Sequence, residues 1–523
     1  MSIGIWFGAV CPIIILFLAM SVFHMKTERA AFLGILFAAA SALLIGKSSL
    51  FIVGMDLAKG AFSALNILIV IWPAVFLYEM LEYADVFQCI KQMIQKKTQD
   101  ELVLILLICW LFASFLQGIT GFGVPVAVCA PLLIAVGVKP LWAVMITLLG
   151  HAWANTYGTF ALAWDALITQ SETTHILMTK IIAGALLWGV NIAGALLICW
   201  FYGKGKALRH MLPFVLVIST VQGGGQLLVS LANSTIAAFI PTTLALAVGW
   251  LILNLGFYTK PWKMDSGMMR ESAQKVESAS QGKEKEAVFP FVLLAAISVI
   301  LLLIPPIHTV LNRAVLQLSF PAVETGRGFT VEATTTYGTI HIFTHAGFVL
   351  FLTVLITYFL YKKKGMMTKA KMKDVRTATW KKILPTSLGI LFLVMMAQVL
   401  KGSGLMELVA RGVTQVTGEY YSFAVPFLGL LGAFVTSSNT SSNILLGSFQ
   451  KTAADLLAVN EAAVLAAQTA GGAIGTVVGP STILLGTTTA GCKGKEGDVL
   501  KFMLPIVLLE AVLTGLVAGI LTL

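Results

Sequence analysis

Residues 435–443 read VTSSNTSSN, a run of mostly uncharged polar side chains between two apolar stretches. Ser, Thr and Asn side chains donate and accept hydrogen bonds, and none of them ionises at neutral pH. The chain contains no H-E-x-x-H motif, no G-x-S-x-G motif and no paired carboxylates within its apolar segments. The chemistry that this pattern favours is therefore the binding of a hydrated solute rather than catalysis.

A second interruption, QGITGFGVP at 117–125, combines glycines with a proline. Gly121 and Gly123 allow close backbone approach, and Pro125 suits the first turn of a new helix. Such a break predicts either a binding site or a close helix–helix contact through small residues.

Further small and polar patches occur at 151–156 and 469–491. For a single glycine in the later patch, packing and binding roles are equally open. The residues that we predict to bind the solute all lie at or beside these interruptions; they are Gln117, Gly121, Phe122, Gly123, His151, Asn155, Thr440, Ser441, Ser442, Asn443, Ser481 and Thr482.

The elements that must position these residues are membrane helices. Of the 523 residues, 58% are hydrophobic and only 11% are charged, whereas soluble domains carry about 25% charged residues. The mean hydropathy is +0.90. Apolar runs such as 103–116 do not alternate, which excludes a transmembrane β-barrel. We therefore predict an all-α polytopic membrane protein.

Apolar segments recur along the chain and predict about twelve to fourteen crossings with additional re-entrant pieces. Four basic loops can all lie in the cytoplasm, and the strongest of these are 258–286 and 362–382. The N-terminus and the 305–341 connection then lie outside. The net charge of +11 fits these loops without a nucleic-acid partner. We expect a multi-pass protein of the bacterial cytoplasmic (inner) membrane, surrounded by lipid.

Residues 113–160 and 432–480 form an internal repeat in which Thr120 aligns with Asn439. The loop charges make the two copies run in opposite directions, as in the inverted repeats of secondary transporters. The predicted domains are scaffold helices at 1–100, a first transport core at 101–165, scaffold helices at 166–420, a second transport core at 421–498 and a C-terminal helix at 499–523.

An interrupted helix at membrane depth survives only where it lines an enclosed, wet cavity, because unpaired backbone groups in hydrocarbon cost several kcal/mol. Half-helix N-termini carry partial positive charge and suit a carboxylate. Carbonyl-bearing C-terminal ends suit Na⁺. We therefore expect a carboxylate to lie near Gly121, Gly123, Ser441 and Ser481.

Several motifs resemble the bacterial lactate permease family; they are FLQGITGFGVPVAV (115–128), GVKPLW (137–142), VTSSNTSSN (435–443), AGGAIGTVVGPSTI (470–483) and AGCKGKEGDVLKF (490–502). The resemblance implies an inner-membrane symporter of small 2-hydroxy monocarboxylates such as lactate or glycolate, coupled to protons. The family typically has a glutamate at the position of Gln117, an aspartate at that of Asn439 and a lysine at that of Thr476. Neutral side chains stand at these positions here, and they cannot carry a proton.

Two coupling ions, Na⁺ and H⁺, therefore stay open. Ser438, Asn439 and Thr440 resemble the S-N-T sodium motif of the divalent-anion/sodium symporters, which implies a Na⁺ site with Thr120 as its counterpart in the first repeat. Alternatively, His151 titrates, because histidine changes charge near physiological pH. We expect no cofactor and no structural metal besides the coupling ion. A homodimer is one alternative for the oligomeric state, and a membrane enzyme or a channel is the competing class of function.

Overall fold

The computed structural model describes residues 3–121, 123–270 and 283–522. Within these ranges, ten helices are long and apolar enough to cross a membrane, which confirms the predicted all-α polytopic class. Three shorter apolar helices accompany them, α7 (Val124–Ala135), α12 (Phe239–Asn254) and α18 (Tyr421–Thr436). Two of the three, α7 and α18, adjoin interruptions predicted from sequence.

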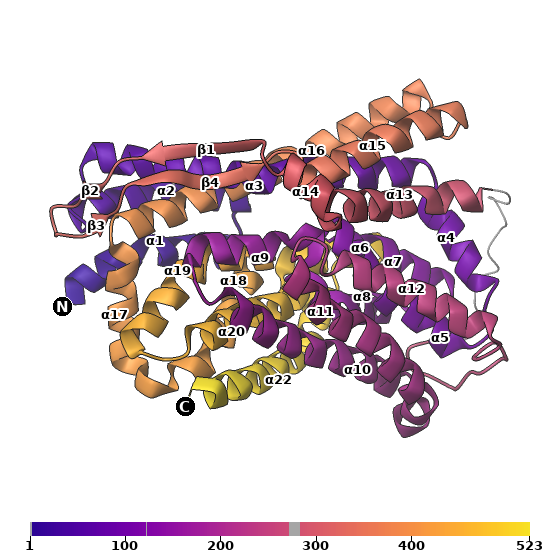
Figure 1. Cartoon of the computed structure of the whole chain (residues 1–523). Helices are drawn as coiled ribbons and strands as arrows, with labels where there is room; N and C mark the ends of the chain where they lie inside the picture. Colours follow the sequence, from indigo (N-terminus) through magenta and orange to yellow (C-terminus); the bar gives the residue numbers. More distant parts are fainter. Residues whose placement is uncertain (1–2, 122, 271–282, 523) are drawn as a thin grey trace.

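Most of the other helices outside the repeats flank the core. Before the first repeat these are α1 (Ile3–Ser21), α2 (Thr27–Leu44), α3 (Leu50–Tyr83) and α4 (Val86–Gln95). Between the repeats they are α10 (Ile176–Ser219), η3 (Thr220–Gly224), α11 (Gly225–Ala232), α13 (Glu284–Leu303), α14 (Pro305–Leu311), α15 (Ala346–Lys363), α16 (Lys369–Gly402), α17 (Leu405–Thr417) and η4 (Gly418–Tyr420). The long helices α3 and α16 pack against each other extensively, and α2 packs on α16. Figure 1 shows this layer above the repeats.

The two repeats have parallel element orders. The first contains α5 (Glu101–Leu106), the π-helical turn η1 (Leu107–Phe112), α6 (Ala113–Ile119), α7, α8 (Pro140–His151), the 3₁₀ turn η2 (Ala152–Asn155) and α9 (Gly158–Ser171). The second contains α18, α19 (Asn439–Leu457), α20 (Glu461–Gly475), the 3₁₀ turn η5 (Thr476–Val478) and α21 (Pro480–Thr489), and α22 (Glu496–Thr522) follows it. In each repeat a helix breaks, a second helix leads to a tight turn, and a third breaks again.

The turn between α7 and α8 and the turn between α19 and α20 lie at opposite ends of the protein. Contacts of both turns with the long helix α22 show this. Near the first turn, the Trp142 ring lies 5.1 Å from the ring of Phe502. At the second turn, Asn460 Nδ2 donates to the carbonyl of Leu521 at 3.3 Å. Phe502 and Leu521 lie about 28 Å apart along α22, at about 1.5 Å per residue. Because this is about the thickness of a hydrocarbon core, the repeats have inverted geometry.

Each repeat packs its half-helices against those of the other. Half-helices that follow a break pack in pairs between the repeats. The helix α9 of the first repeat packs on α19 of the second, and α7 of the first packs on α21 of the second. Figure 1 shows α9 and α19 beside each other near the middle of the protein. This reciprocal packing brings the interruptions of both repeats together near the middle of the protein.

The helix α10 turns back on itself. Gly203 and Lys204 have non-helical backbone angles, and an added Cβ on Gly223 would lie 2.4 Å from the ring of Trp188. An added Cβ on Gly184 would likewise lie 2.9 Å from Leu227. The segment from Ile176 to Ala232 therefore forms two antiparallel passes that meet at Gly203.

The predicted connection at 305–341 contains a β-hairpin that sequence reasoning missed. The strands are β1 (Val315–Phe320), β2 (Val323–Glu324), β3 (Thr330–Val331) and β4 (Thr334–His341); β1 pairs with β4 and β2 with β3, both antiparallel. Tyr337 Oη lies 2.9 Å from Ser63 Oγ on α3 and accepts from Gln398 Nε2 on α16 at 2.8 Å. These contacts hold the hairpin against the α3/α16 layer. The sequence of the connection alone does not indicate these distant partners.

Candidate transport site

The interruptions of both repeats surround a cavity of about 70 Å³. Its lining consists of Gln117, Gly123, His151, Asn155, Gly158, Thr159, Ser437, Ser438, Asn439, Thr440, Thr476 and Thr482. Among the described residues, this lining includes no Asp, Glu, Lys or Arg, and its one ionisable member is His151. The volume is far below the roughly 300–1,000 Å³ of pockets for drug-sized ligands, so the cavity suits a small polar solute.

The first break lies between α6 and α7 and depends on glycine. Gly121 has a φ of +55° and Gly123 a φ of +78°, values that side chains with a Cβ rarely adopt. An added Cβ on Gly121 would lie 2.2 Å from Thr159 Oγ1 on α9. Gly123 precedes α7 without any side-chain cap. Phe122, which we predicted to bind solute, lies outside the described residues.

The second break lies between α18 and α19 and depends on serine. Ser437 takes a left-handed φ of +55°. Ser438 is the N-cap of α19, and its Oγ accepts from the backbone N–H of Ser441 at 3.2 Å. Thr436 Oγ1 donates to the Gly432 carbonyl at 2.7 Å and thereby occupies one of the carbonyls at the end of α18. Hydroxyl groups therefore stabilise the helix ends at this break, whereas the first break depends on the backbone freedom of glycine.

The third break follows α8 in the first repeat. His151 ends this helix, and its Nδ1 lies 2.5 Å from the Thr147 carbonyl, so Nδ1 carries the proton. Beyond η2, Thr159, Phe160 and Ala161 have φ values of +50°, +55° and +64°. A left-handed conformation costs roughly 1–2 kcal/mol per residue. Strain of this kind persists where surrounding contacts impose it, typically at functional sites.

The fourth break follows α20 in the second repeat. Thr476 lies in the 3₁₀ turn η5, and Gly479 precedes α21. The backbone N–H of Ser481 donates to Ser437 Oγ at 3.0 Å. The second and fourth breaks are therefore joined to each other at the edge of the cavity.

Reciprocal hydrogen bonds tie the repeats together beside the cavity. Asn155 Nδ2, in the first repeat, donates to Thr476 Oγ1 in the second at 2.9 Å. Asn439 Nδ2, in the second repeat, donates to Thr156 Oγ1 in the first at 3.2 Å. Each asparagine thus reaches from its own break to a threonine of the other repeat.

The structure brings many of the predicted site residues together at the cavity; these are Gln117, Gly123, His151, Asn155, Ser438, Asn439, Thr440 and Thr482. Among the described residues, the predicted ones that lie outside its lining are Thr120, Gly121, Ser441, Ser442, Asn443 and Ser481. Thr120 Oγ1 donates to the Leu116 carbonyl at 3.0 Å. Asn443 Nδ2 donates to Thr469 Oγ1 and to the Ala163 carbonyl, both at 2.9 Å. The hydrogen bonds of these side chains stabilise the helices behind the cavity lining.

Sequence reasoning missed Gly158, Thr159, Ser437 and Thr476 as lining residues. Thr159 directly follows the patch at 151–156, and Ser437 lies inside the VTSSNTSSN run. The internal repeat could have indicated these residues. A small or hydroxyl residue beside a break in one repeat predicts a lining residue beside the equivalent break in the other repeat.

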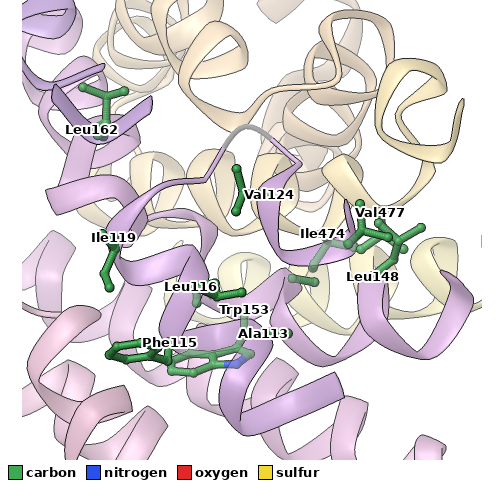
Figure 2. Close-up of a cluster of buried hydrophobic side chains, with 14 of the residues drawn as sticks. Ala113, Phe115, Leu116, Ile119, Val124, Leu148, Trp153, Leu162, Ile474 and Val477 are labelled. Atoms are coloured by element: carbon green, nitrogen blue, oxygen red, sulfur yellow. The ribbon is translucent and has the colours of Figure 1, made fainter. Parts of the chain in front are cut away.

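Apolar packing holds the first break in place beneath the polar lining. Figure 2 labels Ala113, Phe115, Leu116, Ile119, Val124, Leu148, Trp153, Leu162, Ile474 and Val477, all of which belong to the buried core. Ile474 and Val477 come from the second repeat and the others from the first. Trp153 Nε1, buried in this cluster, donates to Ser114 Oγ at 3.0 Å. The position of the break is therefore set by both repeats.

Two inverted repeats whose broken helices meet at a small uncharged cavity define a membrane transporter. The family model for L-lactate permease matches residues 7–523, and the chain belongs to this family.

Relatives along nearly the whole chain carry matching names. The chain is 27% identical to the L-lactate permease of Halalkalibacterium halodurans, over 95% of this chain and 93% of the relative. It is 26% identical to the L-lactate permease of Escherichia coli K12, over 98% and 96%. It is 25% identical to the glycolate permease GlcA of the same organism, over 97% and 94%. Because these relatives are permeases, the protein is a transporter and not an enzyme.

Two solved structures are similar at low identity. MtrF of Neisseria gonorrhoeae aligns with a TM-score of 0.46 and 12% identity, covering 90% of this chain and 84% of MtrF. The YdaH transporter of Alcanivorax borkumensis aligns with a TM-score of 0.43 and 12% identity, covering 88% and 85%.

Proposed function

We propose that the protein is a cation-coupled symporter that carries a small 2-hydroxy carboxylate, such as lactate or glycolate, across the bacterial cytoplasmic membrane. The observation that carries this proposal is the uncharged cavity at which four half-helices begin and four end. The names of the relatives, L-lactate permease and glycolate permease, support the class of solute.

The carboxylate is proposed to bind at the helix start that lacks a side-chain cap. The helix α7 begins beside the cavity without any side-chain cap. By contrast, α19 is capped by Ser438, the Ser481 N–H in the first turn of α21 donates to Ser437 Oγ, and the first turn of α9 has non-helical backbone angles at 159–161. An uncapped N-terminus presents backbone N–H groups and partial positive charge, worth about 0.3–1 kcal/mol to an anion at an exposed site and more where it is partly buried. Asn155 and Gln117 add amide groups that can bond the 2-hydroxyl.

The coupling cation has two candidate positions. For Na⁺, the second break supplies neutral oxygens from Ser438, Asn439 and Thr440, and Asn439 Oδ1 is buried without a hydrogen-bond donor. For H⁺, His151 supplies a ring whose Nε2 has no hydrogen-bond partner among the described residues. The geometry of the cavity accommodates either ion, so the proposal is cation coupling in general.

The test is uptake of labelled L-lactate into proteoliposomes that hold a Na⁺ gradient, a pH gradient or neither. We expect accumulation above the equilibrium level under one of the two gradients, and competition by unlabelled glycolate. Equilibration without accumulation would indicate a channel or a uniporter and would overturn symport. A thermal-shift screen of carboxylates identifies another substrate if lactate fails, since ligand binding raises stability by RT ln(1 + [L]/Kd).

A further inference from the structure

Glu510 is a carboxylate buried on the inner face of α22. Its residue is 6% exposed, and both carboxylate oxygens lack a hydrogen-bond partner among the described residues. Its neighbours on the same buried stripe include Val507, Ala511 and Thr514. Leu509 and Leu513, on the other face, are 60% and 53% exposed. The carboxylate therefore points into the protein rather than toward lipid.

Glu510 lies at the depth of the helix breaks. Along α22 it stands about 12 Å from Phe502 and about 16 Å from Leu521, and these residues mark the levels of the two opposite hairpin turns. The helix packs against α18, α20, η5, α21 and α8, which belong to the two repeats. All five have ends or residues at the cavity, so α22 packs directly on the core.

The surroundings of Glu510 supply no cation. Among the described residues, no Lys, Arg or His nitrogen lies within ion-pair distance of its carboxylate. The ionisable side chains on the elements packed against α22 are Tyr421, which donates to Gln450 Oε1; Glu461, which lies 3.8 Å from Lys451; and His151 at the cavity. On α22 itself, Glu496, Asp498 and Lys501 lie in the first two turns.

Another buried carboxylate of the protein is neutralised differently. Glu79, on α3, lies 2.5 Å from Lys382 Nζ and forms an ion pair. An ionised carboxylate without such a partner is strongly disfavoured in an apolar medium, and it takes up a proton instead. A proton on Glu510 would remove this cost in the closed conformation.

We propose that Glu510 is the proton-binding site of the transport cycle. The carboxylate takes a proton from water on one side of the membrane and is buried as the acid while the core is closed. It returns the proton to water on the other side, and no other bond forms or breaks. This inference rests on the proposed symport function, and it supplies the titratable carrier that Gln117 and Asn439 cannot provide.

The decisive variant is Glu510→Gln, which is neutral and close in shape to the protonated acid. We expect it to lose all pH-driven accumulation of L-lactate while retaining lactate counterflow, the exchange of labelled for unlabelled solute, at near the wild-type rate. The matched control is Glu172→Gln, at an exposed carboxylate paired with Lys401, which should accumulate lactate like the wild type. If Glu510 only fills space, Glu510→Gln will accumulate lactate normally, and the inference is overturned.

Two further measurements keep the test informative if Glu510→Gln does not fold. Glu510→Asp keeps an acid at the site and should retain coupling with a shifted pH dependence. Difference infrared spectra of the wild type across pH should show the C=O stretch of a protonated carboxyl at neutral pH; its absence would contradict the inference. If the wild type accumulates lactate on a Na⁺ gradient alone, this inference fails and symport stands. If the wild type moves no carboxylate, the proposed function fails instead.

Discussion

The first and second breaks reach the same geometry by different chemistry. Between α6 and α7, Gly121 and Gly123 take positive φ values, and α7 begins without a side-chain cap. Between α18 and α19, Ser437 takes the positive φ and Ser438 caps α19. One break is made of backbone freedom and the other of hydroxyl groups.

The difference indicates a division of labour within one cavity. A glycine break leaves helix N–H groups unpaired and gives room for close approach, which favours an anion. A serine break satisfies its own N–H groups and presents neutral oxygens. If the proposed function is right, the solute's carboxylate lies nearer the first break than the second.

The largest effect is expected from adding a methyl group to the glycine break. In Gly121→Ala, left-handed strain and overpacking against Thr159 Oγ1 each cost about 1–3 kcal/mol. We expect loss of transport and a clear fall in the thermal stability of the purified protein. The matched control is Gly54→Ala, because an added Cβ there meets nothing within 4 Å; its effect should be neutral or stabilising by up to about 1 kcal/mol. A stable, active Gly121→Ala protein would contradict the role of glycine in this break.

A charge placed in the serine break should add a new pH dependence to the affinity for lactate. In Asn439→Asp, an ionised side chain about 6 Å from the carboxylate opposes it by about 2–3 kcal/mol at an effective dielectric of 20, roughly a 30- to 150-fold weaker affinity. The protonated form is neutral and resembles asparagine. The loss of affinity for lactate should therefore appear as pH rises through the pKa of the new carboxyl group and disappear as pH falls below it. Lactate uptake by the variant should then depend more strongly on proton concentration than uptake by the wild type. KM for lactate measured across pH checks this, and a profile equal to that of the wild type would rule it out.

Removal of the serine cap should have a moderate effect on stability. Ser438→Ala removes the acceptor for the Ser441 N–H and should cost about 1 kcal/mol, whereas Ser438→Gly should cost a few tenths. Chemical denaturation or thermal unfolding in detergent would measure both variants. An unchanged stability of Ser438→Ala would show that the hydroxyl group does not stabilise α19.

The smallest effect is expected from the bonds that join the repeats. A double-mutant cycle of Asn155→Ala with Thr476→Val should give a coupling energy near 0.6 kcal/mol, the average for polar contacts between membrane helices. The mirror cycle, Asn439→Ala with Thr156→Val, should give a similar value. Strongly unequal couplings would mean that the two links are not equivalent.

The sequence alone predicted the interruptions because their cause is local. Glycine, proline and clustered hydroxyl residues perturb a helix wherever it lies, so 117–125 and 436–443 were recognisable. The orientation of individual side chains was not local. Because α19 begins at Asn439, Ser442 and Asn443 turn toward α20 and α9 within a helical turn. Only the central residues 437–440 of the VTSSNTSSN run line the cavity.

Other features depend on partners far away in the chain. The hairpin of β1 and β4 is held by Ser63 and Gln398, which no loop pattern indicates. Glu510 looked like part of a separate C-terminal helix, and only the packing of α22 against both repeats makes it a core residue. Long-range contacts of this kind are set by the folded arrangement, so a single sequence does not disclose them.

The paired asparagine bonds, from Asn155 to Thr476 and from Asn439 to Thr156, restrict how the cavity can change sides. The break after α8 is thereby linked to both breaks of the second repeat, so sliding one repeat past the other would break both links. Together with the apolar packing between the repeats, these links favour a motion in which both repeats move as one unit relative to the α3/α16 layer, so that the walls around the solute stay the same on both sides of the membrane.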